Sequence, residues 1–85
     1  MRVLIPNPLR SYTAEAAVVA ARGRTLDELA TDLDRQYPGL RFRIVDEQGS
    51  IRPHINVYVA GLRASLTTAV PPDAVVHVIP AVSGG

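Results

Sequence analysis

TLDELATDLDRQYPG, residues 25–39, is the stretch of sequence that decides the fold. Thr25 followed by Glu28 forms a capping box, and the acidic side chains of the first turn suit the positive end of the helix dipole. Pro38-Gly39 ends the segment, because proline cannot continue the hydrogen-bond ladder. The stretch predicts one amphipathic helix that begins at Leu26. Its buried face is predicted from apolar residues at helical spacing, namely Leu26, Leu29, Ala30, Leu33 and Tyr37.

The segments next to this helix have the character of strands. Residues 2–5 (RVLI) are short and branched and stop at Pro6. Residues 15–22 (EAAVVAAR) have two valines at their centre, which favour a strand, although the alanines also permit a helix. After the helix, residues 40–45 (LRFRIV) alternate apolar residues with arginine. Period two predicts a short strand with Leu40, Phe42 and Ile44 on one face.

Two stronger strand signals lie in the second half of the chain. Ile55–Val59 (INVYV) and residues 75–79 (VVHVI) are rich in β-branched residues and bounded by proline and glycine. Residues 66–70 are weaker and fit a brief strand or a single helical turn. The order β-β-α-β-β-β predicts an α+β fold of the β-grasp type, in which one main helix packs on one face of a mixed sheet. We expect the usual β-grasp arrangement, with the first and last strands adjacent at the centre, a domain over residues 1–79 and a flexible tail over residues 80–85.

Length and charge exclude several classes of protein. A chain of 85 residues holds one small domain, and 47% apolar with 20% charged residues is ordinary globular composition. The net charge is +1 and no charged blocks occur, so nucleic acid and anionic membrane are not expected partners. We recognise no secretory signal and no window long enough to span a bilayer, which predicts a soluble, cytoplasmic protein.

The chemistry-bearing side chains are few. Cysteine is absent, which excludes disulfides, Cys-ligated zinc, iron–sulfur clusters and thiol catalysis. All nine basic residues are arginine. His54 and His77 are 23 positions apart without zinc-ligand spacing, so no metal site is predicted. The acidic residues are interpreted as solvated side chains, on the polar face of the helix (Asp27, Asp32 and Asp34) or in a loop (Asp46 and Glu47). Ser11 and Ser65 lie in no recognisable nucleophile motif. Arg41 and Arg43 fit an exposed strand face that could dock an acidic partner.

The chain ends in PAVSGG, residues 80–85, where a strand stopped by proline continues as small residues. Two terminal glycines have no Cβ and expose the carboxylate without steric cover. A terminal carboxyl has a pKa near ~3.5, so it is an anion at neutral pH and can attack a phosphoanhydride. A frayed terminus with accidental glycines is the alternative interpretation.

Two stretches give the chain a family resemblance: RPHINVYVAG, residues 52–61, and VVHVIPAVSGG, residues 75–85. With the element order, they resemble the ThiS/MoaD family of ubiquitin-like sulfur carrier proteins, most nearly the CysO-type carriers of cysteine biosynthesis. The ending is the specific motif, and the rest supports it. Ala60 departs from the pattern, because the family often has Asn before Gly61, and this predicts a different turn type.

The resemblance implies that the chain is a protein co-substrate and not an enzyme. A ubiquitin-activating-like adenylyltransferase would use ATP to adenylate the carboxylate of Gly85, and a sulfur donor would convert it to a thiocarboxylate. A sulfur-accepting biosynthetic enzyme, of cysteine first and of thiamine or molybdopterin as other options, would take the sulfur. The carrier itself would bind no cofactor. By the same resemblance, the residues that contact these partners are Val59, Ile79, Pro80, Ala81, Val82, Ser83 and Gly84.

The sequence is also compatible with two other functions. A ubiquitin-like modifier would use the same activated Gly85 to form isopeptide bonds with lysines of other proteins. An inert β-grasp interaction module would keep its binding after loss of Gly84 and Gly85. Ile55–Val59 and residues 75–79 have apolar side chains at both odd and even positions, and therefore on both faces of the sheet. This favours either a partner on the outer sheet face or a fully buried pair of strands.

Overall fold

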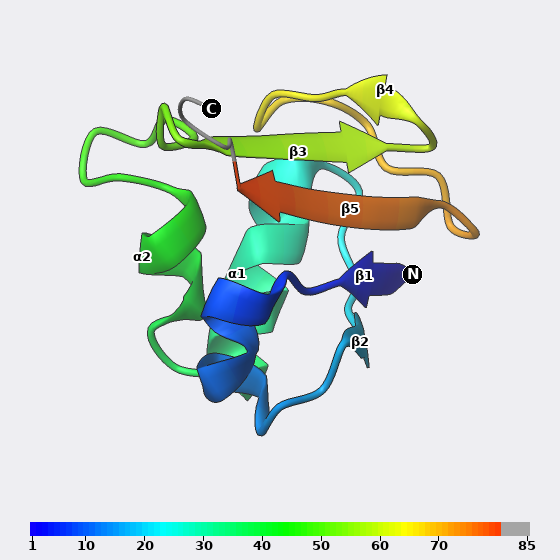
Figure 1. Ribbon diagram of the computed structural model, residues 1–85. Coiled ribbons are helices and arrows are strands. Elements are labelled where there is room, and N and C mark those ends of the chain that lie inside the picture. Colours follow the sequence, from blue (N-terminus) through cyan, green and yellow to red (C-terminus); the bar gives the residue numbers. More distant parts are fainter. Residues whose placement is uncertain (81–85) are drawn as a thin grey trace.

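The computed structural model describes residues 1–80 and contains a five-stranded mixed sheet in the order β2-β1-β5-β3-β4. Helix α1 lies across one face of this sheet (Figure 1). β1 runs parallel to β5 beside it, and every other strand pair is antiparallel. The predicted pairing of the first and last strands is therefore confirmed. The strands are β1 Arg2–Leu4, β2 Val18–Ala20, β3 Ile55–Val59, β4 Leu62–Arg63 and β5 Val75–Pro80.

Helix α1, Leu26–Gln36, begins as the sequence predicts. The Thr25 hydroxyl accepts a hydrogen bond from the Glu28 N–H at 3.3 Å. The Glu28 carboxylate accepts from the N–H of Arg24, one residue before the cap, at 2.9 Å. The N–H groups of Leu26 and Asp27 donate to carbonyls of residues 68 and 66. Residues 66–70 thus satisfy the first turn of α1, which would otherwise have unpaired donors, and they form no strand or helix of their own.

The core lies between α1 and the sheet. Val3, Val57 and Val76 come from the three central strands and are at most 1% exposed. Leu29 and Leu33 of α1 pack against them with equally low exposure. The face predicted for α1 is the face that is buried, except that Tyr37 is only partly covered. Burial of this apolar surface is the main stabilising contribution in so small a domain.

The predicted strand over residues 40–45 is wrong, because Leu40–Ile44 forms a short helix, α2. Gly39 adopts a left-handed φ of 95°, which lets the chain turn immediately after α1. The Asp34 carboxylate then accepts hydrogen bonds from the N–H groups of Gly39 and Arg41 at 3.0 and 3.2 Å. Leu40 and Ile44, four residues apart, are buried on one side of α2. Phe42 lies between them in sequence and points outward.

The connection from β1 to β2 also differs from the prediction. Asn7–Thr13 forms a 3-10 helix, and β2 is limited to Val18–Ala20 instead of residues 15–22. Ala14 and Glu15 both have left-handed φ values, which interrupt any extended backbone there. The Arg10 guanidinium donates to the Ile5 carbonyl at 2.9 Å and links the 3-10 helix to the end of β1. The two strands pair antiparallel.

A two-residue turn joins β3 to β4, a strand that the sequence did not predict. Ala60 and Gly61 have φ values of 51° and 83°, so both central residues are left-handed, as in a type I′ hairpin. The expectation that Ala60 changes the turn type is wrong. Alanine instead occupies a backbone conformation that asparagine tolerates better, at a cost of about 1 kcal/mol.

Within residues 1–80, no helix is long and apolar enough to cross a membrane. The same residues contain no group of three or more His, Cys, Asp or Glu side chains that could hold a metal ion.

Candidate functional site

The site is built on the sheet face that α1 does not cover. Strand alternation in β5 sends Val76 and Val78 into the core and His77 and Ile79 to the outer face. Ile79 remains 43% exposed, the most exposed residue of this strand. Because β5 lies between β1 and β3, its outward side chains occupy the middle of the outer face (Figure 1).

Register places the outward side chains of β3 beside those of β5. Tyr58 is paired with His77, and Asn56 is paired with Ile79. Together with Gly61 these four residues line a shallow hollow of about 350 Å³. An aromatic ring, an imidazole, an amide and an aliphatic side chain thus meet in one half-buried patch. We call these five residues, Asn56, Tyr58, Gly61, His77 and Ile79, the outer-face patch. Such a mixture of aromatic, apolar and hydrogen-bonding groups is typical of protein interfaces.

Val59, expected on this docking surface from the family resemblance, lies instead on the inward face of the sheet. Val59 is 5% exposed and shares the inward parity of Ile55 and Val57. Alternation along β3 therefore sends Asn56 and Tyr58 outward instead. These two residues were missed, although the alternation within INVYV was the signal that could have found them.

Pro80, which the sequence analysis assigns to the tail, belongs to the sheet. Pro80 is the last residue of β5 and is paired with Ile55 at the start of β3. Its position at a strand end fits proline, which has no N–H to donate to the sheet. Residues Ala81, Val82, Ser83, Gly84 and Gly85 lie outside the described part of the chain. The described part of the chain thus ends at Pro80, beside β3 and next to Ile79 of the outer-face patch.

The other polar candidates make contacts within the fold or are exposed to solvent. Asp32 accepts from the Arg22 N–H at 2.9 Å and pairs with Arg35 on the surface of α1. Asp46 accepts from two N–H groups in its own turn, those of residues 48 and 50. His77 belongs to the outer-face patch, whereas His54 is exposed in the loop before β3. The structure does not bring these groups together into a catalytic arrangement.

Comparison with known proteins identifies the family of this chain. The family model of the ThiS family matches residues 3–85. The chain belongs to the ThiS family. The ThiS/MoaD resemblance inferred from the two sequence stretches is thereby confirmed.

Relatives of this ThiS-family chain are named as sulfur carriers. It is 34% identical to the sulfur carrier protein CysO of Mycobacterium tuberculosis, over 98% of this chain and 96% of that protein. The crystal structure of Mycobacterium tuberculosis CysO superimposes with a TM-score of 0.91 at 32% identity, covering 95% of this chain and 98% of that one.

Two further solved structures extend the comparison. A chain of the Amycolatopsis orientalis BexX/CysO complex gives a TM-score of 0.91 at 32% identity and covers 99% of this chain and 98% of that one. The small archaeal modifier protein SAMP1 of Haloferax volcanii gives 0.80 at 24% identity, over 99% of this chain and 97% of its own, a likeness of fold alone. The predicted β-grasp architecture is confirmed.

Proposed function

We propose that this ThiS-family chain is a sulfur carrier whose Gly85 carboxylate is adenylated, converted to a thiocarboxylate and used as a sulfur donor in biosynthesis, that of cysteine first. The observation that carries the proposal is the end of β5. Pro80 leaves the sheet at the side of the outer-face patch, and the remaining sequence is AVSGG. A partner that holds the patch can therefore receive the tail at the same time. The family and the CysO relatives support this assignment.

The proposed chemistry takes two steps in a partner adenylyltransferase. An oxygen of the Gly85 carboxylate attacks the α-phosphorus of ATP, forms a mixed anhydride with AMP and releases pyrophosphate. The sulfur of a sulfide-type donor then attacks the acyl carbon, and AMP leaves with the former carboxylate oxygen. The carrier supplies the reacting carboxylate, and the partner supplies ATP and the donor. Neither step needs a cofactor or a nucleophilic side chain of this chain.

The outer-face patch supplies the docking contacts in this proposal. Ile79 and Tyr58 present apolar and aromatic surface, and the His77 and Asn56 side chains offer hydrogen-bonding groups. Aromatic residues at the centre of a patch contribute strongly to protein–protein affinity. Ala81, Val82, Ser83 and Gly84 follow Pro80 and would enter the partner's active site, where small side chains fit a narrow channel.

Intact mass spectrometry tests the proposal. The protein is incubated with its activating enzyme, ATP and sulfide, beside a variant truncated before Gly84. We expect a mass gain that corresponds to the replacement of one oxygen by sulfur, and no gain in the truncated variant. An unchanged mass, with an activating enzyme that releases pyrophosphate in the presence of the full chain, would overturn the sulfur-carrier assignment.

Two further outcomes would support the two alternative functions. Adducts of higher mass on lysines of other proteins would establish a ubiquitin-like modifier. Retention of partner binding and biological activity by the truncated variant would establish an interaction module with an inert tail.

A further inference from the structure

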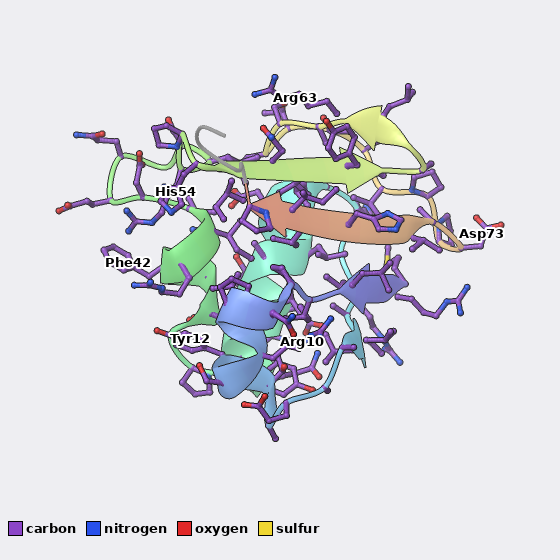
Figure 2. The ribbon with its side chains drawn as sticks, viewed as in Figure 1. Arg10, Tyr12, Phe42, His54, Arg63 and Asp73 are labelled. Carbon is purple, nitrogen blue, oxygen red and sulfur yellow. The ribbon has the colours of Figure 1, made fainter. Side chains whose placement is uncertain are left out.

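Phe42 is an exposed aromatic side chain on the outer side of α2. It is 54% exposed, although the two other apolar residues of the helix, Leu40 and Ile44, are at most 4% exposed. Its ring points away from α1 and the sheet (Figure 2). Arg52 covers part of the ring, and the apolar surface that remains exposed is unfavourable in water. The exposed part of the ring is apolar surface that another molecule can cover.

Arg52 holds this ring in place. Its guanidinium carbon lies 4.5 Å from the centroid of the Phe42 ring, and its Nε donates to the Phe42 carbonyl at 2.7 Å. The terminal guanidinium nitrogens form no hydrogen bond or ion pair with the described residues. They remain available for a carboxylate, with the fork of Arg52 fixed in advance by the ring and the carbonyl.

Arg43 of α2 supplies a second positive charge, besides that of Arg52 in the segment before β3. It is exposed and has no ion pair or hydrogen bond within residues 1–80. The neighbouring arginine of α2 differs, because Arg41 pairs with Asp27 and is partly buried. Glu47 is the exposed acidic residue of the following turn, whereas the Asp46 carboxylate accepts hydrogen bonds from backbone N–H groups of that turn.

These residues lie close to the place from which the tail continues. The Arg52 carbonyl accepts from the Ile55 N–H at 2.9 Å, and Ile55 is the strand partner of Pro80. Figure 1 shows α2 on the side of the molecule toward which β5 points. A protein that receives the tail beyond Pro80 therefore passes within reach of Arg52.

We propose that Phe42, Arg43 and Arg52, here called the α2 surface, dock an acidic segment of the protein that receives the end of this chain. The inference rests on the proposed function, because that partner is the enzyme that activates or accepts from Gly85. Carboxylates of the segment pair with the two guanidinium groups, and an apolar side chain covers the Phe42 ring. Contact at both the outer-face patch and the α2 surface fixes the direction in which the tail enters the partner.

An acidic protein segment fits the α2 surface better than nucleic acid does. Arg52, which lies over the Phe42 ring, and the exposed Arg43 of the same helix as Phe42 match a short run of carboxylates. Nucleic acid needs a longer basic stripe, and the remaining arginines are scattered over a chain with a net charge of +1. Pairing of exposed charges is screened by salt, so the docking contributes mainly to the association rate and the orientation.

The test is a titration of the full chain, labelled for NMR, with a synthetic glutamate-rich peptide that has one central leucine. No activating enzyme is present, so the result is independent of the mass experiment on Gly85. We expect backbone shifts confined to residues 41–43 and 51–54, and a marked weakening at high ionic strength. Arg43→Glu should lower the affinity about fivefold, and Phe42→Ala should lower it by a similar factor. Glu47→Gln should raise it.

Arg24→Glu is the matched control, because Arg24 is an exposed arginine outside the α2 surface, in the segment that leads into α1. It should bind the peptide as the parent chain does, and the thermal midpoint of Arg43→Glu should equal that of the parent. Equal losses for Arg43→Glu and Arg24→Glu, or shifts spread over the whole chain, would overturn the proposal. Binding of a thymidine oligonucleotide at the same residues with equal affinity would overturn it as well.

Discussion

Gly23 is the position at which one added carbon should disturb this fold most. A Cβ at residue 23 would lie 2.4 Å from the backbone nitrogen of Leu29, and 2.8 Å from both the Leu29 Cα and the Glu28 carbonyl carbon. All three are backbone atoms of α1, so no side-chain rotation can make room. Leu29 is 1% exposed, and moving the helix away from residue 23 would disturb its packing in the core.

Gly23→Ala should therefore lower the free energy of unfolding by about 3 kcal/mol, the upper part of the range for overpacking. A domain of this size has a total stability of about 4–13 kcal/mol. The loss is thus a large share of the whole. Gly61→Ala is the control, because a Cβ there meets nothing within 4 Å and adds only the strain of a left-handed φ of 83°. That strain costs about 1 kcal/mol.

Urea denaturation followed by circular dichroism measures both variants. With a dependence of about 1 kcal/mol per molar urea, Gly23→Ala should lower the midpoint by about 3 M and Gly61→Ala by about 1 M. The close approach of residue 23 to α1 is refuted if Gly23→Ala costs no more than Gly61→Ala.

Three further predictions address the cap, the turn and the patch. Thr25→Ala removes the side-chain acceptor for the Glu28 N–H and should lower stability by about 1 kcal/mol, seen as a fall of about 4–8 °C in Tm; an unchanged Tm would contradict the capping role. Ala60→Asn should raise stability by about 0.5–1 kcal/mol in urea denaturation, and a loss would contradict the type I′ turn. Ile79→Ala should slow thiocarboxylate formation about tenfold in the mass assay at limiting partner, with Leu62→Ala as the exposed apolar control; equal rates would remove Ile79 from the docking surface.

Helix α1 could be predicted because its signals are local. The cap, the apolar spacing and the Pro-Gly stop all lie within residues 25–39, and each agrees with the others. The central strands β3 and β5 are equally clear, since β-branched residues crowd into short runs between turn residues. The pairing of β1 with β5 followed from the element order, not from any residue pattern.

Helix α2 could not be predicted in the same way. Leu40 and Ile44 lie on one face both in a strand of period two and in a helix of period 3.6. Only the position of Phe42 distinguishes the strand from the helix. A strand would place Phe42 on the same face as Leu40 and Ile44, whereas a helix places it on the opposite, exposed side. The choice is made by the left-handed Gly39 and by Asp34, whose carboxylate caps the new helix from the preceding one. That tertiary contact has no signature in residues 40–45.

The candidate site was predicted in part. Ile79 is exposed on the outer face, whereas Val59, which was assigned to the docking surface by the family resemblance, is buried on the inward side of β3. Tyr58 and Asn56 replace it. The roles of Gly84 and Gly85 stay predictions, since those residues lie outside the described chain.

The parallel pairing of β1 with β5 has a practical consequence for labelling. Arg2 is in register with Val75 at the start of β5, so the Met1 amine and Pro80 lie at opposite ends of the central strands. Every basic side chain is arginine, which leaves that amine as the group that an amine-reactive dye modifies in this sequence. A fluorophore attached there would lie at the end of the central strands opposite Pro80.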